Sequence, residues 1–578
     1  MNRQVRCAGA LALAVVLQGY GAPGWAGDRE EGAHHRPPVT GGPLRQPCET
    51  LAGSLSVPNT AFTASTSVAA GALSIAGKPI PAHCLLTGKM FERKSPVDGQ
   101  TYAIGFEMRL PLDWNGRFFY QANGGIDGSL VTATGPTSGG GPLTSALLQG
   151  FAVISSDAGH NGAQNPFFGI DPQARLDYGY QAVGKLTPMA KHVIRAAYDK
   201  RPEVSYIGGC SNGGRHTMVA AARYADQYDG YLVGSPGFNL PKAAVANMYG
   251  AQQYAPLATD PADLSTAWTL AERQLFSSKV LERCDALDGL KDGLVQNVRA
   301  CQRVFSLEHD VPTCSGPRNG TCLSAAQKTA IGNIFAGPKD AHGQPIYASF
   351  PYDAGYATGG TVFWEFIAPL LLDSGAVGFI FKTPPANPVG FNGPVFTLTA
   401  NINELAEQIF ATNALYTQSG MEFMTPPHPE RIDDNLRRHG ARMLVSHGVS
   451  DSIFSINDTT AWYRSLKHSG EHHRGHHDDD GGPSDVVRLF RVPGMGHCGG
   501  GPSTDQYDLL TKLVEWVEKG RAPERVIASA RGPGNAGGAN PEVPAGWAPD
   551  RTRPLCAYPR IAKYHGGDPE RAESFVCR

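Results

Sequence analysis

Three residues that lie far apart in the sequence could together perform nucleophilic catalysis. Ser211 lies in GCSNG, which fits the G-x-S-x-G pattern of a sharp turn between a strand and a helix. Such a turn exposes the serine hydroxyl above a sheet and leaves room only for small neighbours. Asp451 follows the strand-like stretch ARMLVSHG, and His497 lies in a glycine-rich loop after VVRLFRV. The order serine, acid, histidine is the one found with this turn, so we expect Ser211, Asp451 and His497 to form a catalytic triad.

Two other histidines lie close to these residues in the sequence. His447 stands at a strand end directly before the acid, where a structural role is expected. His216 lies about one turn into the helix after Ser211, and we expect it on the surface of that helix.

Acyl transfer also needs two N–H donors for the oxyanion. The backbone N–H of Asn212, directly after the serine, is the first candidate. The second is expected from the loop in RFFYQANGGIDGS, with Gly125 as the candidate and Gly124 next to it.

A thiol stands beside each of two catalytic candidates. Cys210 precedes Ser211 and Cys498 follows His497, so a disulfide between them would hold the nucleophile and the base together. The alternative is a buried free thiol. Ten of the eleven cysteines lie outside the expected signal peptide, and an even number in an exported chain predicts five disulfides. Short loops favour the pairs Cys314–Cys322, Cys284–Cys301 and Cys556–Cys577.

The stretch CDALDGLKDGLVQN predicts a calcium site. Its three carboxylates alternate with glycines, and clustered carboxylate and carbonyl oxygens suit Ca²⁺. The expected ligands are Asp285, Asp288 and Asp292 with the carbonyls of Leu290 and Leu294. The spacing differs from an EF-hand, and the alternative is an acidic surface loop. A structural role is expected, because the loop is far from the triad in sequence.

The elements around these motifs predict an α/β fold. TYAIGFEMRLPL, RFFYQ, FAVISSD and VSYIGG are strand-like, whereas LTPMAKHVIRAAY, RHTMVAAARYADQY and YDLLTKLVEWVEKG are helical. Strands alternating with helices predict a mostly parallel sheet. This pattern is interrupted from about residue 240 to 430, so we expect a catalytic domain of residues 48–239 and 431–578 with an inserted lid of residues 240–430.

The N-terminus predicts export. Arg3 and Arg6 precede the apolar run AGALALAVVL, which is too short to span a bilayer, and cleavage after Ala26 is expected. Residues 1–26 are therefore interpreted as a signal peptide of a secreted or periplasmic protein, and residues 27–47 as a flexible segment. A formal net charge of -2 over 578 residues argues against nucleic acid or an anionic membrane as partner.

The motifs GCSNGGR, CDALDGLKDG, HGVSD, VPGMGHC and RTRPLCAYP resemble those of the tannase and feruloyl esterase family. The resemblance covers nearly the whole mature chain. It implies an α/β-hydrolase fold, a mostly parallel sheet flanked by helices, with a large inserted calcium-binding lid. It also implies the disulfides Cys48–Cys84, Cys210–Cys498, Cys284–Cys301, Cys314–Cys322 and Cys556–Cys577.

Other stretches, including WNGRFF and DPQARLDYGY, are similar to bacterial members that hydrolyse terephthalate monoesters. That resemblance implies that Phe454 packs on the substrate ring. The chain departs from those members at Asn212, where they carry a glutamate. It also has no arginine in the lid stretch FIFKTPPANPVGFNGPVF to hold a free carboxylate, and Lys382 is the only cation there.

These observations predict a secreted serine carboxylesterase acting on small aromatic esters of the hydroxycinnamate or gallate type. A terephthalate monoester hydrolase is the first alternative. A non-catalytic binding protein on the same scaffold, and a metal-dependent hydrolase using the histidine-rich stretch 468–482, are alternatives of another class. Phe363, Trp364 and Phe366 are lid aromatics that could contact substrate or belong to the lid core.

Overall fold

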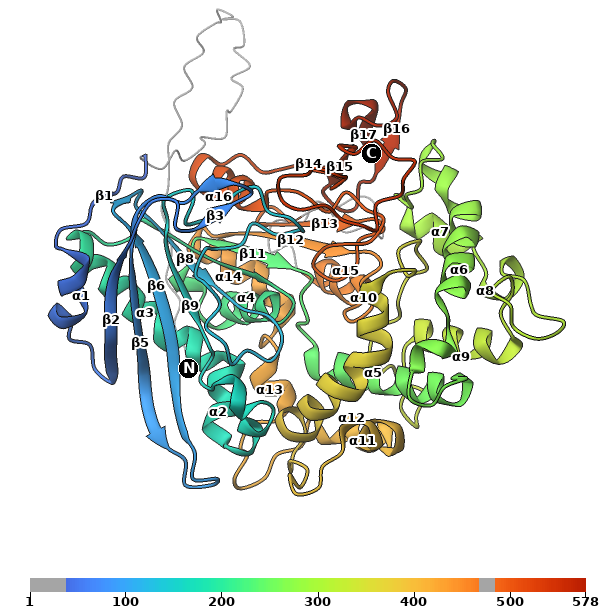
Figure 1. Ribbon diagram of the computed structural model, residues 1–578, viewed down its shortest axis with the longest axis horizontal. Coiled ribbons are helices and arrows are strands. Elements are labelled where there is room, and N and C mark those ends of the chain that lie inside the picture. Colours follow the sequence, from blue (N-terminus) through green and yellow to red (C-terminus); the bar gives the residue numbers. More distant parts are fainter. Residues whose placement is uncertain (1–37, 467–483) are drawn as a thin grey trace, which may run out of the picture.

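The computed structural model describes residues 38–466 and 484–578, and its centre is a twisted nine-stranded sheet (Figure 1). The strand order is β13-β12-β11-β10-β8-β9-β6-β5-β2. The bounds, from one edge to the other, are Val487–Val492, Arg442–Gly448, Gly230–Gly234, Val204–Cys210, Arg117–Gln121, Ala152–Ser156, Thr101–Pro111, His83–Lys94 and Thr60–Val68.

The sheet is parallel from β13 to β9 and antiparallel from β9 to β2. The prediction of a mostly parallel sheet is therefore confirmed, with an antiparallel edge that the sequence pattern did not predict. Apolar runs such as VSYIGG give no sign of direction, because a strand buried on both faces lacks the polar alternation of an exposed edge.

Helices cover both faces of the parallel part. On β10, Ile207 joins one hydrophobic cluster while Val204 and Tyr206 join another, as expected when neighbouring side chains point to opposite faces. The first cluster includes residues of α3 (Ala182–Tyr198) and α4 (Asn212–Arg223). The second includes residues of α16 (Leu509–Lys519). The sheet is thus the middle layer of three.

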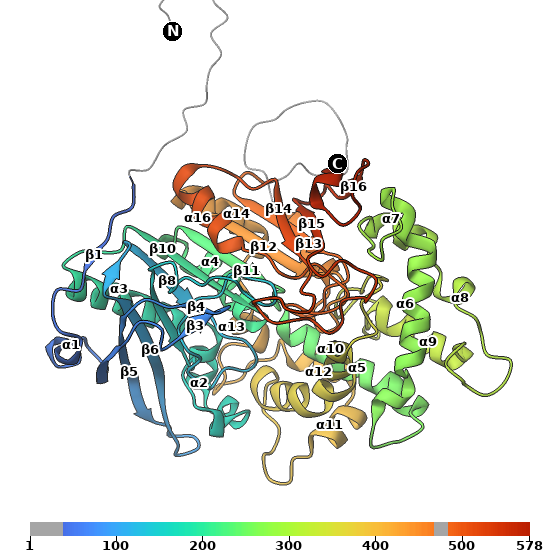
Figure 2. The same cartoon turned by 45° about the horizontal axis from the view of Figure 1, so that its top comes forward.

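Residues 240–430, between β11 and β12, form a large helical segment, which we call the lid. The part from α6 (Leu270–Cys284) to α9 (Ala325–Ala336) lies on the side of the molecule opposite β2 and β5 in both views (Figures 1 and 2). The α-helices of the lid are α5 (Leu240–Tyr254), α6 (Leu270–Cys284), α7 (Val298–Val304), α8 (Leu307–Asp310), α9 (Ala325–Ala336), α10 (Gly359–Val362), α11 (Gly393–Thr399), α12 (Ile402–Gln408) and α13 (Gly420–Met424). The lid has a hydrophobic cluster of its own, which includes Trp268, Phe276 and Phe335.

All five disulfides expected from the family resemblance are present. The pairs are Cys48–Cys84, Cys210–Cys498, Cys284–Cys301, Cys314–Cys322 and Cys556–Cys577. The alternative of a free thiol at Cys210 is therefore wrong.

Part of the N-terminal segment expected to be flexible is docked on the domain. Gly42–Pro43 form β1, which pairs with β7 (Asp113–Trp114). The predicted signal peptide and the histidine-rich stretch 468–482 lie outside the described residues. Within residues 38–466 and 484–578, no helix is both long and apolar enough to cross a membrane.

Candidate active site

The turn after β10 holds Ser211 in a strained conformation. Its φ is 67°, and α4 begins at the next residue. The flanking glycines are required by a close approach of the neighbouring strand. A Cβ at Gly209 or Gly213 would lie 2.1 or 2.3 Å from the carbonyl oxygen of Ala122. The glycines of the GCSNG motif are therefore required for steric reasons. The turn exposes the serine hydroxyl at the carboxyl end of the sheet.

Asp451 and His497 meet beside this turn, as the sequence predicted from their order. Asp451 follows β12, His497 follows β13, and His497 Nδ1 donates to Asp451 Oδ2 over 2.8 Å. His497 Nε2 is buried and has no hydrogen-bond partner among the described residues. This nitrogen is therefore available to a hydroxyl, and Ser211 and His497 line the same groove.

The carboxylate of Asp451 is held in its ionised form. Burial alone would raise its pKa, but the positive charge that His497 can carry, with hydrogen bonds from His447 and His497, lowers the pKa below its usual range. Its Oδ1 accepts from the N–H groups of Ile453 and Phe454, both at 3.0 Å. An ionised, immobile carboxylate can orient an imidazole and stabilise its protonated form.

His447 lies on the other side of the same carboxylate. Its Nε2 is 3.2 Å from Asp451 Oδ2 and 2.9 Å from the carbonyl of Phe454, while Nδ1 bonds to Thr459 Oγ1 at 2.9 Å. The ring is fully buried and does not line the groove. These contacts give His447 a structural position behind the acid.

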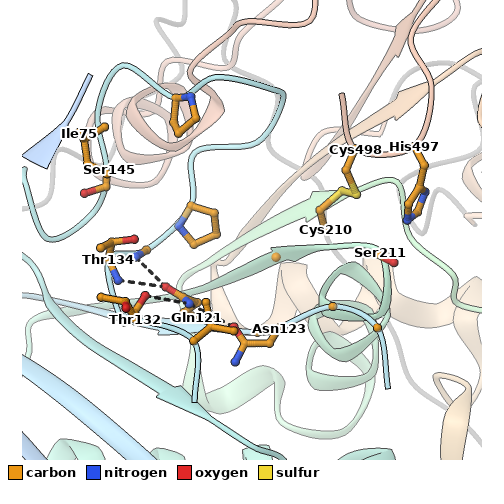
Figure 3. A pocket seen from close by; sticks show the side chains of 18 of the residues that line it. Ile75, Gln121, Asn123, Thr132, Thr134, Ser145, Cys210, Ser211, His497 and Cys498 are labelled. Atoms are coloured by element: carbon orange, nitrogen blue, oxygen red, sulfur yellow. Dashed lines mark hydrogen bonds between the residues drawn. A yellow bond between two sulfur atoms is a disulfide. The ribbon is translucent and has the colours of Figure 1, made fainter. Parts of the chain in front are cut away.

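The disulfide between Cys210 and Cys498 connects the nucleophile turn to the histidine loop. Its Cα atoms are 6.0 Å apart, although 288 residues separate them in sequence. Figure 3 shows the disulfide next to Ser211 and His497, on the wall of the groove. It therefore limits how far the two loops can separate.

The loop after β8 presents Gly124 and Gly125 to the same groove. A Cβ on Gly124 would lie 3.6 Å from Ser211 Cβ, and Gly125 has a φ of 65°. Asn212 is the first residue of α4, where a backbone N–H has no partner within the helix. The geometry therefore brings the N–H of Asn212 and the glycine pair to one place beside Ser211.

A buried cluster of polar side chains holds this glycine loop in place. Asp127 Oδ2 accepts from Asn212 Nδ2 at 2.8 Å and from His216 Nε2 at 2.9 Å. His216 is only 4% exposed, so the expectation that it lies on the helix surface is wrong. The helix packs that face against the glycine loop, and a polar residue there is buried because Asp127 is its partner.

His216 is neutral in this cluster. Burial lowers its pKa well below the usual value, and the charge of Arg215 lowers it further. Arg215 Nη2 donates to His216 Nδ1 at 3.0 Å and Arg215 Nε donates to Asn212 Oδ1 at 2.6 Å. The amide of Asn212 is thus fixed at both ends, next to the turn that carries Ser211.

Removing this anchor should reduce turnover more than binding. Asp127→Asn replaces the carboxylate with an amide whose single oxygen makes weaker hydrogen bonds to Asn212 and His216, so the glycine loop should be held less firmly beside the reacting carbonyl. We expect kcat for a soluble ester to fall about tenfold, which is less than the loss of a whole oxyanion donor. KM should change much less. Steady-state kinetics beside Asp113→Asn, an exposed aspartate on β7, tests this. An unchanged kcat in Asp127→Asn would refute the anchoring role.

A lid residue that the sequence did not suggest supports the acid and the histidine loop. Asp353 is fully buried, and its Oδ2 accepts from Ser450 Oγ at 2.6 Å and from the N–H of Gly494 at 2.9 Å. Ser450 precedes Asp451, and Gly494 lies in the loop that leads to His497. One carboxylate thus connects the lid to both loops. A lone aspartate in FPYDAGY carries no sequence signal for this role.

The lid aromatics divide between substrate groove and core. Trp364 lines the groove, and its ring lies 4.8 Å from that of His497. Phe363 is 43% exposed, and Phe366 is buried in the lid cluster. Phe454 is 1% exposed and also packs against His497, with ring centroids 5.3 Å apart.

Lys382 does not reach the groove. Its Nζ donates to the carbonyl of Pro384 at 2.6 Å, and its own carbonyl accepts from the buried Arg175. The groove itself has a volume of about 530 Å³, and none of its lining residues is an aspartate, glutamate, lysine or arginine.

The predicted calcium loop is closed by the Cys284–Cys301 disulfide and packs against the C-terminal segment. Asp285 accepts from the N–H groups of Asp292 and Gly293, and Asp292 Oδ2 pairs with Arg553 at 2.5 Å. In the described ranges, no group of three His, Cys, Asp or Glu side chains is gathered so that it could hold a metal.

One feature of the loop does fit a cation. Asp288 Oδ2 is buried and has no hydrogen-bond partner among the described residues. Burying a carboxylate oxygen without a hydrogen-bond partner costs free energy of folding unless a cation binds to it. Carbonyl oxygens such as those of Leu290 and Leu294 would have to complete the ligand set, and calcium accepts mixed sets of this kind.

Comparison with known proteins agrees with this geometry. The family described as "Tannase and feruloyl esterase" matches residues 84–578. The chain is 36% identical over 545 residues to the mono(2-hydroxyethyl) terephthalate hydrolase of Piscinibacter sakaiensis, covering 86% of this chain and 85% of that protein. The crystal structure of feruloyl esterase B from Aspergillus oryzae superposes with a TM-score of 0.72 at 22% identity, covering 92% of this chain and 99% of the other.

A tannin acyl hydrolase from Aspergillus niger shares the same fold, with a TM-score of 0.62 at 18% identity and coverage of 91% and 92%. The match of the family to most of the chain, with the 36% identical relative, settles the classification: the chain belongs to the tannase and feruloyl esterase family.

Proposed function

We propose that this protein is a carboxylic ester hydrolase in which Ser211 is the nucleophile, His497 the base and Asp451 the residue that orients it. The observation that carries the proposal is the 2.8 Å hydrogen bond from His497 Nδ1 to Asp451, with Nε2 of the same ring left free in the groove that Ser211 lines. Family membership supports ester hydrolysis independently.

In the proposed reaction, Ser211 Oγ attacks the ester carbonyl while His497 Nε2 takes its proton. The imidazolium then gives that proton to the leaving alcohol, and an acyl-enzyme remains. Water, deprotonated by His497, then attacks the acyl-enzyme, the bond to Ser211 Oγ breaks, and His497 returns the proton to that oxygen as the acid leaves. The ionised carboxylate of Asp451 stabilises the imidazolium in both steps.

The negative charge on the carbonyl oxygen needs donors in place before the reaction begins. We assign these to the N–H groups of Asn212 and Gly125, with Gly124 as the alternative to Gly125. The helix that begins at Asn212 adds its positive end to the same point. The side chain of Asn212 is occupied by Asp127 and Arg215, so it serves to fix the turn.

The proposed substrates are small aromatic esters of the hydroxycinnamate or gallate type. Trp364 provides an aromatic face at the catalytic end of the groove, and Phe454 stands beside it behind His497. Phe454 is buried and does not line the groove here, so a local rearrangement beside His497 would be needed before it could contact a substrate ring.

Hydrolysis of a terephthalate monoester is the second candidate. The 36% identical relative is named for that activity. The groove argues against this activity, because none of its lining residues is a cation that could bind the free carboxylate of the substrate. Lys382 lies outside the groove and donates to the carbonyl of Pro384. A carboxylate without a cation loses hydration that nothing replaces.

Rates on methyl ferulate, methyl gallate and mono(2-hydroxyethyl) terephthalate, measured side by side with the same enzyme preparation, test the substrate class. Preference for the two phenolic esters would support the proposal. Preference for the terephthalate monoester would contradict it and favour the second candidate.

Calcium and export complete the proposal. We assign structural Ca²⁺ to Asp285, Asp288 and Asp292 with the carbonyls of Leu290 and Leu294, where it would hold the loop in place and take no part in the reaction. The N-terminal signal peptide predicted over residues 1–26 would direct the chain to the periplasm or the outside of the cell.

Calcium removal is expected to lower the melting temperature by several degrees, since a cation that binds only the folded chain stabilises it. Differential scanning calorimetry with and without a chelator measures the shift. In Asp288→Asn the chelator should have little effect, whereas Asp113→Asn should behave as the unaltered chain. A melting temperature indifferent to chelator and to added Ca²⁺ would rule the site out.

A further inference from the structure

One helix of the lid forms part of the groove wall. α10 continues through three π-helical segments to residue 381, and we call residues 359–381 the groove helix. In both views α10 lies between the sheet and the lid helices α6 and α9 (Figures 1 and 2). Trp364, in the second turn of the groove helix, lines the groove and packs against the ring of His497. The position of this helix therefore decides where Trp364 stands relative to the catalytic base.

Both ends of the groove helix are held by charged side chains from outside the lid. At its first residue, the N–H of Gly359 donates to Glu542 Oε1 at 2.9 Å. At its last turn, Arg175 donates to the carbonyls of Phe379 and Lys382 at 2.6 and 3.2 Å. A carboxylate at the N-terminus and a guanidinium at the C-terminus each meet the helix dipole with the favourable sign. The groove helix is thus fixed to the catalytic domain as well as to the rest of the lid.

Glu542 holds the loop of His497 with its other oxygen. Its Oε2 accepts from the N–H of Gly501, four residues after His497, at 2.6 Å. The carbonyl of Gly501 accepts from Nδ2 of the buried Asn540 at 2.8 Å, and Asn540 Oδ1 accepts from the N–H of Glu542 at 3.0 Å. The carboxylate of Glu542 therefore connects the groove helix to the loop that carries the base, with one oxygen for each.

These two links account for the whole carboxylate of Glu542. Its oxygens accept from Gly359 and Gly501, and no cation of the described chain forms an ion pair with them. Glu542 does not line the groove, so it makes no contact with a substrate bound there. Any contribution of Glu542 to the reaction must therefore pass through the groove helix and the loop of His497.

We propose that Glu542 is a positioning residue, which sets the groove helix against the loop of His497 so that Trp364 packs on the base at the catalytic end of the groove. This inference rests on the proposed function. Hydrogen bonds from backbone N–H groups to a carboxylate are short and strong, so a single side chain can fix the distance between the two elements. Catalytic groups depend on such support, because small displacements of reacting groups cost rate.

The kinetic test uses Glu542→Gln, which keeps the size of the side chain but has one oxygen for two N–H donors. We expect kcat/KM for methyl ferulate to fall about tenfold, less than the 100-fold cost of a 1 Å misplacement. In a Trp364→Ala chain the same substitution should cost at most about threefold, because the side chain that Glu542 positions is gone. Glu573→Gln, an exposed glutamate in the same C-terminal segment, is the control and should leave the rate unaltered.

Hydrogen exchange of backbone amides tests the connection without reference to activity. In Glu542→Ala, which removes both acceptors, peptides covering residues 359–366 and 494–503 should both exchange faster than in Glu573→Ala. Circular dichroism establishes that each variant is folded.

Faster exchange in only one of the two peptides, or in neither, would overturn the inference. Equal losses of kcat/KM from Glu542→Gln with and without Trp364 would also overturn it, since they would show that Glu542 does not act through the groove helix. A wild-type chain inactive on methyl ferulate and methyl gallate would instead contradict the proposed function, on which the exchange measurement does not depend.

Discussion

Ser211→Ala is expected to reduce kcat/KM for methyl ferulate roughly 10⁴- to 10⁶-fold, which is the scale of losses when a nucleophile of this kind is removed. Alanine has no hydroxyl to attack the carbonyl, whereas the groove and the hydrogen bond between His497 and Asp451 stay in place. The chain should fold normally, because alanine is smaller than serine and adopts the φ of 67° at a similar strain.

Circular dichroism and the melting temperature establish that the Ser211→Ala chain is folded, and the hydrolysis rate gives the result. Ser278→Ala, an exposed serine on the lid helix α6, is the matched control and should keep full activity. Substantial turnover by Ser211→Ala would reject the serine mechanism. A metal-dependent reaction would then be the alternative, and it would be indicated if a chelator abolished the remaining turnover.

The elements nearest the catalytic residues are well predicted from sequence because their signals are local. Buried runs bounded by turn residues predict β8, β9, β10, β12 and β13. The glycines of GCSNG are required because one carbonyl oxygen would lie only 2.1 or 2.3 Å from a Cβ at either position. The pairing of Cys210 with Cys498 follows from their places beside Ser211 and His497.

The residues that hold the triad in place could not be predicted from the sequence, because their hydrogen-bond partners lie far away in the chain. His216 is buried only because Asp127, 89 residues earlier, faces it. Asp353 connects to Ser450 across 97 residues. Neither contact can be predicted from sequence spacing or composition. A polar residue on a helix or loop has the same local sequence pattern whether its partner is water or a buried carboxylate.

The antiparallel edge of the sheet was missed for a related reason. TYAIGFEMRLPL shows that a strand is present, but the partner of β6 on each side is fixed by packing of whole elements. The sequence predicts an inserted segment from a break in the sheet pattern, but not how its helices pack, which depends on contacts such as those among Trp268, Phe276 and Phe335.

Loss of the Cys210–Cys498 disulfide is expected to lower kcat about 100-fold, because misplacement of reacting groups by about 1 Å costs that much. The double variant Cys210→Ser with Cys498→Ser leaves every catalytic side chain present. Without the disulfide, the histidine loop is held to the nucleophile turn by contacts such as the 3.4 Å hydrogen bond from Cys498 N to Ser235 Oγ, and it can move away. KM should change much less than kcat, since Gln121 holds the groove floor by hydrogen bonds from two backbone N–H groups, independently of the disulfide.

Stability and catalysis must be separated in this experiment, since the same disulfide closes a loop of 288 residues. The chain-entropy relation gives such a link roughly 5–6 kcal/mol of stability, so the melting temperature of the double variant should fall as well. Kinetics are therefore measured well below that temperature, where the chain is folded by circular dichroism. Cys314→Ser with Cys322→Ser, which opens a short loop in the lid, is the matched control and should keep its kcat. A folded Cys210/Cys498 variant with unaltered kcat would show that the disulfide stabilises the fold without positioning His497 against Ser211.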